Sequence, residues 1–77
     1  MKHIVELKAK DNFTLEVTFS EGEVKIYDIK LILNCEVFRP LSELTKFKQV
    51  RNRGYFIEWG EDIDLSADTL YIEGVSI

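Results

Sequence analysis

Hydrophobic and polar residues alternate along three segments in the first part of the chain, residues 3–9, 13–19 and 24–29. A period of two residues is typical of strands that bury one face and expose the other. Turn-forming residues separate the segments, with Asp11 in the first connection and Gly22 in the second. The pattern therefore predicts a meander of three antiparallel strands.

The alternation also predicts which side chains of the first two strands face the core. They are His3, Val5, Leu7 and Ala9 in the first strand and Phe13, Leu15, Val17 and Phe19 in the second. Because successive side chains point to opposite faces of a strand, Ile4 is then expected on the polar face. His3 is expected to be a partly buried structural residue.

The middle of the chain carries short helical signals. The apolar run of residues 31–33 predicts one or two helical turns, and Pro40 favours an extended, irregular conformation for residues 38–41. Ser42 is expected to cap a short helix over residues 43–47. This segment is therefore expected to combine short helices with an irregular loop.

A second hairpin is predicted for residues 49–59, turning at residues 52–54. After an acidic stretch, Ser66 is expected to cap a final short helix that Gly74 ends. Together the elements predict an α+β fold in a single domain. It contains a small antiparallel sheet, made of a three-strand meander plus a second hairpin, with two or three short helices.

The composition is that of one small folded domain spanning residues 1–77. Of these residues 45% are hydrophobic, with only four Gly and one Pro. A chain of this size buries about 60% of the surface of its unfolded form, so it can spare few side chains to line a deep pocket. The formal net charge of −4 disfavours direct binding of nucleic acid and favours a basic partner.

The sequence gives no sign of secretion or of membrane insertion. The charged residues near the N-terminus do not form a signal peptide, and no run reaches the roughly 20 apolar residues of a membrane-spanning helix. Cys35 is the only cysteine, so the chain cannot form an internal disulfide. We therefore expect a cytoplasmic protein.

Several short motifs follow one another in an order that resembles a known family, the domain of unknown function (DUF) 2442 family of small bacterial proteins. The motifs are Leu15-Glu16-Val17-Thr18-Phe19, Glu21-Gly22-Glu23, Tyr27-Asp28, Phe38-Arg39-Pro40-Leu41, Phe47-Lys48-Gln49-Val50, Trp59-Gly60 with Asp62 or Asp64, and Leu70-Tyr71. The order and spacing of these motifs are more specific than any single one of them.

The resemblance implies an α+β fold and supplies no catalytic residues, because no enzymatic activity is established for the family. It implies either a stand-alone protein or one that precedes a helix-turn-helix DNA-binding domain. Stand-alone members are often encoded beside another small protein, which suggests a partner.

Carboxylates provide the first candidate site. Glu61, Asp62 and Asp64 are hard oxygen donors of the kind that Ca²⁺ and Mg²⁺ prefer. Their spacing lacks the third ligand and the downstream Glu of an EF-hand loop. Capping of the final helix by Asp64 or Ser66 is the favoured alternative, and we expect no metal or cofactor, although cation binding stays open.

Aromatic residues provide the second candidate site. Phe38 and Tyr55 are expected to be partly exposed, and Trp59 is either a core residue, the more frequent case, or an interface anchor. With Arg39 they form the predicted partner surface, which consists of Phe38, Arg39, Tyr55 and Trp59.

The remaining candidates support weaker hypotheses. The only basic cluster comprises Lys46, Lys48, Arg51 and Arg53. It supports an alternative role as a regulatory component of a transcriptional or toxin–antitoxin-like system. A catalytic pair of His3 and Cys35 has no support in their spacing, so we expect no enzymatic activity.

The sequence thus predicts a non-enzymatic protein-interaction module. It is expected to pair through a sheet edge or an aromatic patch, with a second copy of itself or with a neighbouring small protein.

Overall fold

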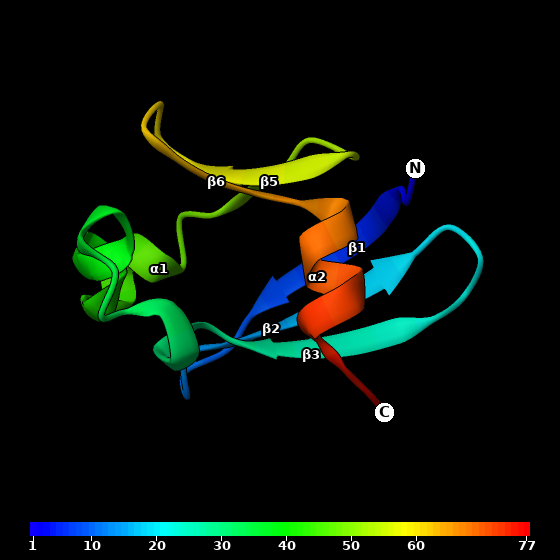
Figure 1. The fold of residues 1–77 in the computed structure, drawn as a ribbon, viewed down its shortest axis with the longest axis horizontal. Coiled ribbons are helices and arrows are strands. Elements are labelled where there is room, and N and C mark those ends of the chain that lie inside the picture. Colours follow the sequence, from blue (N-terminus) through cyan, green and yellow to red (C-terminus); the bar gives the residue numbers. More distant parts are fainter.

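The computed structural model describes residues 1–77 and confirms the α+β class, with two antiparallel sheets and short helices (Figure 1). The four-stranded sheet has the order β1-β2-β3-β7 and contains β1 (Ile4–Ala9), β2 (Thr14–Phe19), β3 (Val24–Asp28) and β7 (Val75–Ser76). The three-stranded sheet has the order β4-β5-β6 and contains β4 (Arg51–Asn52), β5 (Phe56–Trp59) and β6 (Ile63–Ser66).

The predicted meander is confirmed, and its central strand supplies the middle of the core. In β2, Leu15, Val17 and Phe19 are each at most 1% exposed. The residues between them are only partly buried, so β2 has the inward and outward alternation that the sequence predicts.

A β-bulge in β1 makes the predicted facing of this strand wrong at its start. Ile4 pairs with Phe19 and Glu6 with Thr18, so Val5 is an extra residue without a partner. Ile4 is therefore buried and Val5 is 54% exposed, the reverse of the prediction. After the bulge the alternation returns to the predicted phase, with Leu7 opposite Val17 on the inner face.

Phe13 does not belong to β2, as the alternation predicted, because it lies in the preceding turn with a φ of 63°. A positive φ is uncommon for a residue with a bulky side chain. This conformation brings the Phe13 ring to 5.5 Å, centroid to centroid, from Phe47 of the helical segment. The aromatic contact thus joins the β1–β2 turn to the second half of the chain.

The middle of the chain is more regular than predicted. It contains two 3₁₀ helices and a short α-helix, η1 (Ile29–Ile32), η2 (Glu36–Ser42) and α1 (Leu44–Phe47). The expected irregular loop around Pro40 is part of η2, because proline's fixed φ lies within the helical range. Ser42 ends η2, so Glu43 precedes α1 in the N-cap position and no side chain caps this helix.

The end of the chain contains two strands that the sequence did not predict. The acidic stretch forms a tight turn at Gly60, with a φ of 67°, and then continues as β6. The predicted Ser66 cap of α2 (Ala67–Glu73) is confirmed, since the Ser66 hydroxyl accepts a hydrogen bond from the Thr69 amide at 3.0 Å. Gly74 ends the helix and leads into β7.

Hydrogen bonds between β1 and the β4 segment join the two sheets. The Ile4 amide donates to the Gly54 carbonyl at 2.7 Å, and the Asn52 side-chain amide donates to the Ile4 carbonyl at 3.0 Å. In Figure 1, α2 lies across the four-stranded sheet, and the η1–α1 segment lies at the end of the molecule away from the N-terminus. No helix is long and apolar enough to cross a membrane.

Candidate functional site

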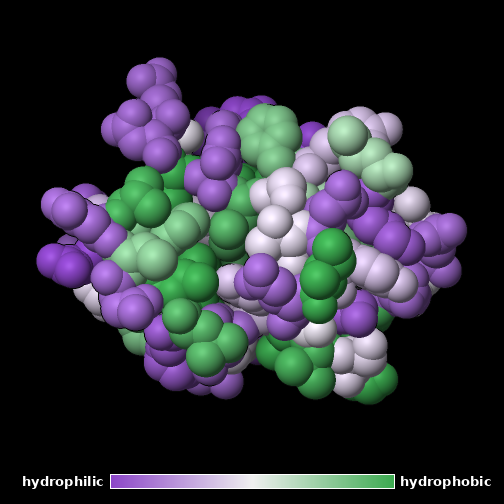
Figure 2. All heavy atoms as spheres, in the orientation of Figure 1, coloured by the Kyte–Doolittle hydropathy of each residue, from purple (hydrophilic) through white to green (hydrophobic).

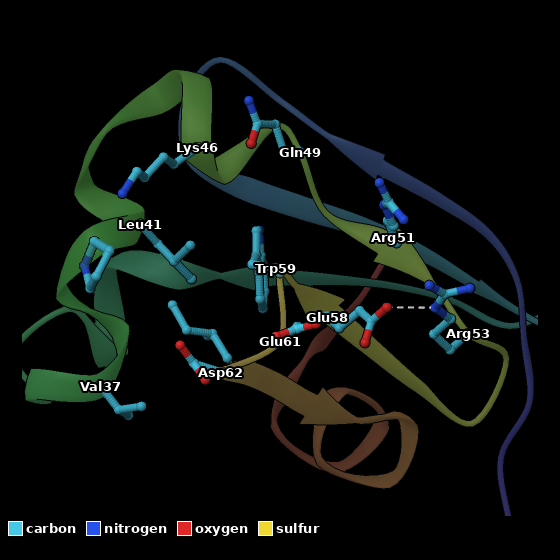
Figure 3. A pocket seen from close by; sticks show the side chains of 13 residues that line it. Val37, Leu41, Lys46, Gln49, Arg51, Arg53, Glu58, Trp59, Glu61 and Asp62 are labelled. Carbon is cyan, nitrogen blue, oxygen red and sulfur yellow. Dashed lines mark hydrogen bonds and ion pairs between the residues drawn. The ribbon is translucent and has the colours of Figure 1, made fainter.

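A pocket of about 930 Å³ lies between the η2–α1 segment and the β5–β6 hairpin (Figure 3). Its apolar lining consists of Val37, Pro40, Leu41, Trp59 and Ile63. Its polar lining consists of Lys46, Gln49, Arg51, Arg53, Glu58, Glu61 and Asp62. The pocket therefore brings members of all three predicted candidate sets to one place, with an equal number of cationic and anionic side chains.

Trp59 lies behind the middle of this pocket and is mainly a core residue. Its side chain is 6% exposed, and its indole N–H donates to the Phe47 carbonyl at 2.8 Å. Its ring stacks on the Phe47 ring with 6.4 Å between centroids. Trp59 thus fastens β5 to α1 and leaves little of its own surface for a partner, unlike the exposed anchor that the sequence also allowed.

The predicted basic cluster is divided by the fold. Lys46, Arg51 and Arg53 line the pocket, whereas Lys48 does not and forms an ion pair with Asp11. The charge of Arg53 is offset by Glu58 at 2.6 Å. Lys46 and Arg51 have no carboxylate within 4.0 Å, so they are the two unpaired cations of the cluster.

The predicted acidic cluster is also divided. Glu61 and Asp62 lie in the β5–β6 turn and line the pocket, whereas Asp64 lies on β6 and is exposed. No group of three or more His, Cys, Asp or Glu side chains comes close enough together to hold a metal ion. The cap of α2 is Ser66 alone, so of the two capping residues considered the structure selects Ser66.

The most exposed aromatic side chains lie at the β4–β5 turn and do not line the pocket. Tyr55 is 53% exposed and Phe56 is 39% exposed. His3 is exposed, so the prediction of a partly buried His3 is wrong. Its ring lies 5.0 Å, centroid to centroid, from the Tyr55 ring. We call Tyr55, Phe56 and His3 the aromatic patch; the rings of Tyr55 and His3 contact each other, whereas Phe56, the next residue along the chain, points to the other face of the sheet.

The predicted partner surface is therefore distributed over three places. Phe38 and Arg39 lie on η2, Trp59 is in the core, and only Tyr55 belongs to the aromatic patch. Sequence reasoning missed Phe56, because the alternation along β5 assigned it to the polar face. A large aromatic residue on the polar face of a strand was nevertheless a usable signal for a contact surface, since such a side chain is costly to leave in water.

The side chains with shifted pKa values lie outside the pocket. Burial, together with the nearby charge of Glu73, raises the pKa of the Tyr27 hydroxyl above its ordinary value. Hydrogen bonding to Glu21 raises the pKa of the partly buried Lys2 ammonium and lowers that of the Glu21 carboxyl. These shifts belong to contacts that hold the four-stranded sheet and α2 together.

The fold defines a class of protein, a small α+β domain with two joined antiparallel sheets and exposed aromatic residues at one turn. The sequence model of the family described as "Protein of unknown function (DUF2442)" matches residues 4–76, nearly the whole chain. The chain belongs to this family, which confirms the resemblance. Neither a curated protein nor a solved structure matches the chain.

Proposed function

We propose that this protein is a non-enzymatic interaction module and that the aromatic patch is its main contact surface. The observation that carries the proposal is the presence of two consecutive aromatic side chains, Tyr55 and Phe56, that are 53% and 39% exposed. Aromatic residues of this kind are enriched among the residues that dominate binding energy at protein interfaces. Their apolar surface is stabilised only when a partner removes it from water.

The backbone turn that carries the patch is already ordered in the free protein. Gly54 has a φ of 86° and its amide donates to the Asn52 side-chain oxygen at 2.8 Å. A Cβ atom at Gly54 would lie 2.9 Å from the His3 ring, so the turn packs closely against the start of the chain. A preorganised contact surface loses less conformational entropy on binding.

The positions of His3 and Cys35 support a role without catalysis. The His3 ring contacts the Tyr55 ring at an angle of 44°, whereas Cys35 precedes η2 in the segment at the opposite end of the molecule from the N-terminus (Figure 1). The only histidine and the only cysteine of the chain are therefore not arranged as a base and a nucleophile.

The partner is a second copy of this chain or a small protein encoded beside it, and two measurements test the proposal. Light scattering at about 100 μM protein detects the homodimer, since self-association depends on protomer concentration. Co-purification with the co-expressed neighbour detects the other partner. The variant Tyr55→Ser/Phe56→Ser is expected to abolish whichever association is found.

Ile72→Ser is the matched control, because Ile72 is an exposed apolar residue on α2. This variant is expected to keep the association. The proposal would be overturned if the protein is strictly monomeric and the co-expressed neighbouring protein does not co-purify with it. It would also be overturned if the double variant leaves an observed association intact.

The regulatory alternative has one specific observation in its favour, the two unpaired cations Lys46 and Arg51 at the pocket. They could contact phosphates of DNA or acidic groups of a DNA-binding partner. A mobility-shift assay at low salt tests direct contact with DNA. If the parent chain shifts the mobility of DNA, the variant Lys46→Ala/Arg51→Ala must weaken that shift. The absence of DNA binding by the parent chain would remove this alternative.

A further inference from the structure

The edges of the two joined sheets differ in how much of their backbone is already used. β4 is covered by β1, through the hydrogen bonds from the Ile4 amide to Gly54 and from the Asn52 side chain to Ile4. β6 forms the other edge of the three-stranded sheet and pairs only with β5. An edge strand presents unpaired N–H and C=O groups to which another chain can add.

The hydrogen-bond pattern identifies which backbone groups of β6 point outward. The Ala67 amide donates to the Tyr55 carbonyl at 2.8 Å, and Ala67 is directly opposite Tyr55 in this register. Hydrogen-bonded pairs alternate along an antiparallel ladder, so Ile63 and Leu65 also point their backbone groups toward β5. The backbone groups of Asp64 and the amide of Ser66 consequently point away from the sheet.

The charges beside this edge decide which partner fits it. Glu61, Asp62 and Asp64 have no cationic group within 4.0 Å, whereas Glu58, opposite Asp64 on β5, is paired with Arg53 at 2.6 Å. A second copy of β6 would place like charges against each other across the new ladder, which is destabilising. A strand that carries Lys or Arg would instead complement them.

The other face of β6 favours apolar side chains in the same partner. Ile63 and Leu65 share a face with Trp59 and Ile57 and are only partly buried. Figure 2 shows hydrophobic side chains gathered on one side of the molecule, between the β5–β6 hairpin and the η1–η2 segment. An added strand would therefore alternate between basic and apolar residues.

We propose that the open edge of β6 receives an extended segment of a different protein, with alternating basic and apolar residues, as a fourth strand of the sheet. This inference rests on the proposed function as an interaction module. It adds a second contact surface to the aromatic patch and specifies the chemistry of the partner that binds there. Main-chain hydrogen bonds would supply affinity, and the alternating side chains would supply specificity.

Amide hydrogen exchange tests the proposal with defined probes. A peptide of about eight alternating Lys and Val residues, with blocked ends, is compared with a Glu and Val peptide of the same length. The Lys peptide is expected to slow exchange of the Asp64 and Ser66 amides by about tenfold or more, because both become hydrogen bonded. The Glu peptide is expected to leave them unchanged.

Charge reversal gives the matched pair of variants. Asp64→Lys is expected to exchange the peptide preference, so that the Glu peptide protects the edge. Glu6→Lys changes the net charge by the same amount on an exposed position of β1 and is expected to keep the preference for the Lys peptide.

Four results would overturn the proposal. They are no protection by the Lys peptide, equal protection by both peptides, protection of β7 instead of β6, and self-association of Asp64→Lys without peptide binding by the parent chain. The last result would mean that Asp64 only prevents edge-to-edge aggregation. Peptide binding that persists in Tyr55→Ser/Phe56→Ser separates failure of the aromatic patch from failure of the β6 edge.

Discussion

The two sheets of this small domain are used differently. The inner face of the four-stranded sheet is almost completely buried, with Leu15, Val17 and Phe19 each at most 1% exposed. The three-stranded sheet buries Ile57 and Trp59 but leaves Tyr55 and Phe56 at its surface. The difference indicates that the first sheet mainly stabilises the fold, while the second leaves aromatic side chains in water, where the proposed function places contacts with a partner.

The largest effect is expected from removing a side chain in the middle of the four-stranded sheet. Leu15→Ala leaves a cavity at a fully buried position and should lower the free energy of unfolding by about 2–5 kcal/mol in urea denaturation. A loss of that size is a large part of the stability of a small domain. Val5→Ala, at the exposed bulge, serves as the control and should change it by less than about 0.5 kcal/mol.

A Leu15→Ala cost no larger than that of Val5→Ala would contradict the assignment of the core to this sheet. A variant too unstable to purify agrees with the assignment, and Leu15→Val, a smaller truncation, then provides the measurable intermediate.

An intermediate effect is expected where the second sheet meets α1. Trp59→Phe keeps an aromatic ring but removes the indole N–H that donates to the Phe47 carbonyl at 2.8 Å. The buried carbonyl then lacks its partner, so the free energy of unfolding should fall by about 1–3 kcal/mol. Circular dichroism must follow unfolding, because Trp59 is the only tryptophan.

Tyr71→Phe is the comparison for this variant, because it removes a hydrogen bond to Glu23 that is exposed to solvent. It should cost much less than Trp59→Phe. Equal costs would mean that the Trp59 hydrogen bond does not fasten β5 to α1.

The smallest effect is a dependence of stability on alkaline pH, located in the four-stranded sheet. Because the pKa of Tyr27 is raised by burial and by Glu73, the folded state keeps this proton at a pH where the unfolded chain releases it. The stabilising contribution is complete below the ordinary pKa of about 10 and is lost as the pH rises through the raised pKa. Stability should therefore decline above about pH 10.

Urea denaturation across this pH range, beside tyrosinate absorbance, measures the effect. Tyr27→Phe should show a shallower decline than the parent chain. The raised pKa of Lys2 acts in the same direction in both proteins, so the difference between the two curves isolates Tyr27. Identical slopes would contradict the assignment of the shift to Tyr27.

Local pattern determined much of the fold but not its exceptions. Alternation correctly predicted β2 and β3, and turn residues correctly located the turns at Gly22 and Gly54, both of which have a positive φ. The β1 bulge was invisible to alternation, because an extra residue changes which side chains face inward only when a partner strand is present. The short strand β7 was missed because two residues give no measurable period, and only pairing with β3 defines them.

The candidate site was predictable in kind but not in arrangement. Composition and spacing identified the aromatic, basic and acidic sets, including Tyr55. They could not tell that Trp59 is taken up by a hydrogen bond to Phe47, or that Lys48 and Arg53 are paired with carboxylates. Such pairings join residues that are distant in sequence or that lie on neighbouring strands, so they depend on the folded geometry.

The sequence by itself determined the α+β class, the meander, the capped final helix and the family, because each follows from local periodicity, local hydrogen bonding or ordered short motifs. Only the tertiary structure decided which charges remain unpaired, which aromatic side chains stay in water and which strand edges stay open. Those properties result from competition among distant groups for burial and for partners. The backbone groups at the β6 edge and the side chains of the aromatic patch are the groups that this competition leaves without a partner or exposed to water.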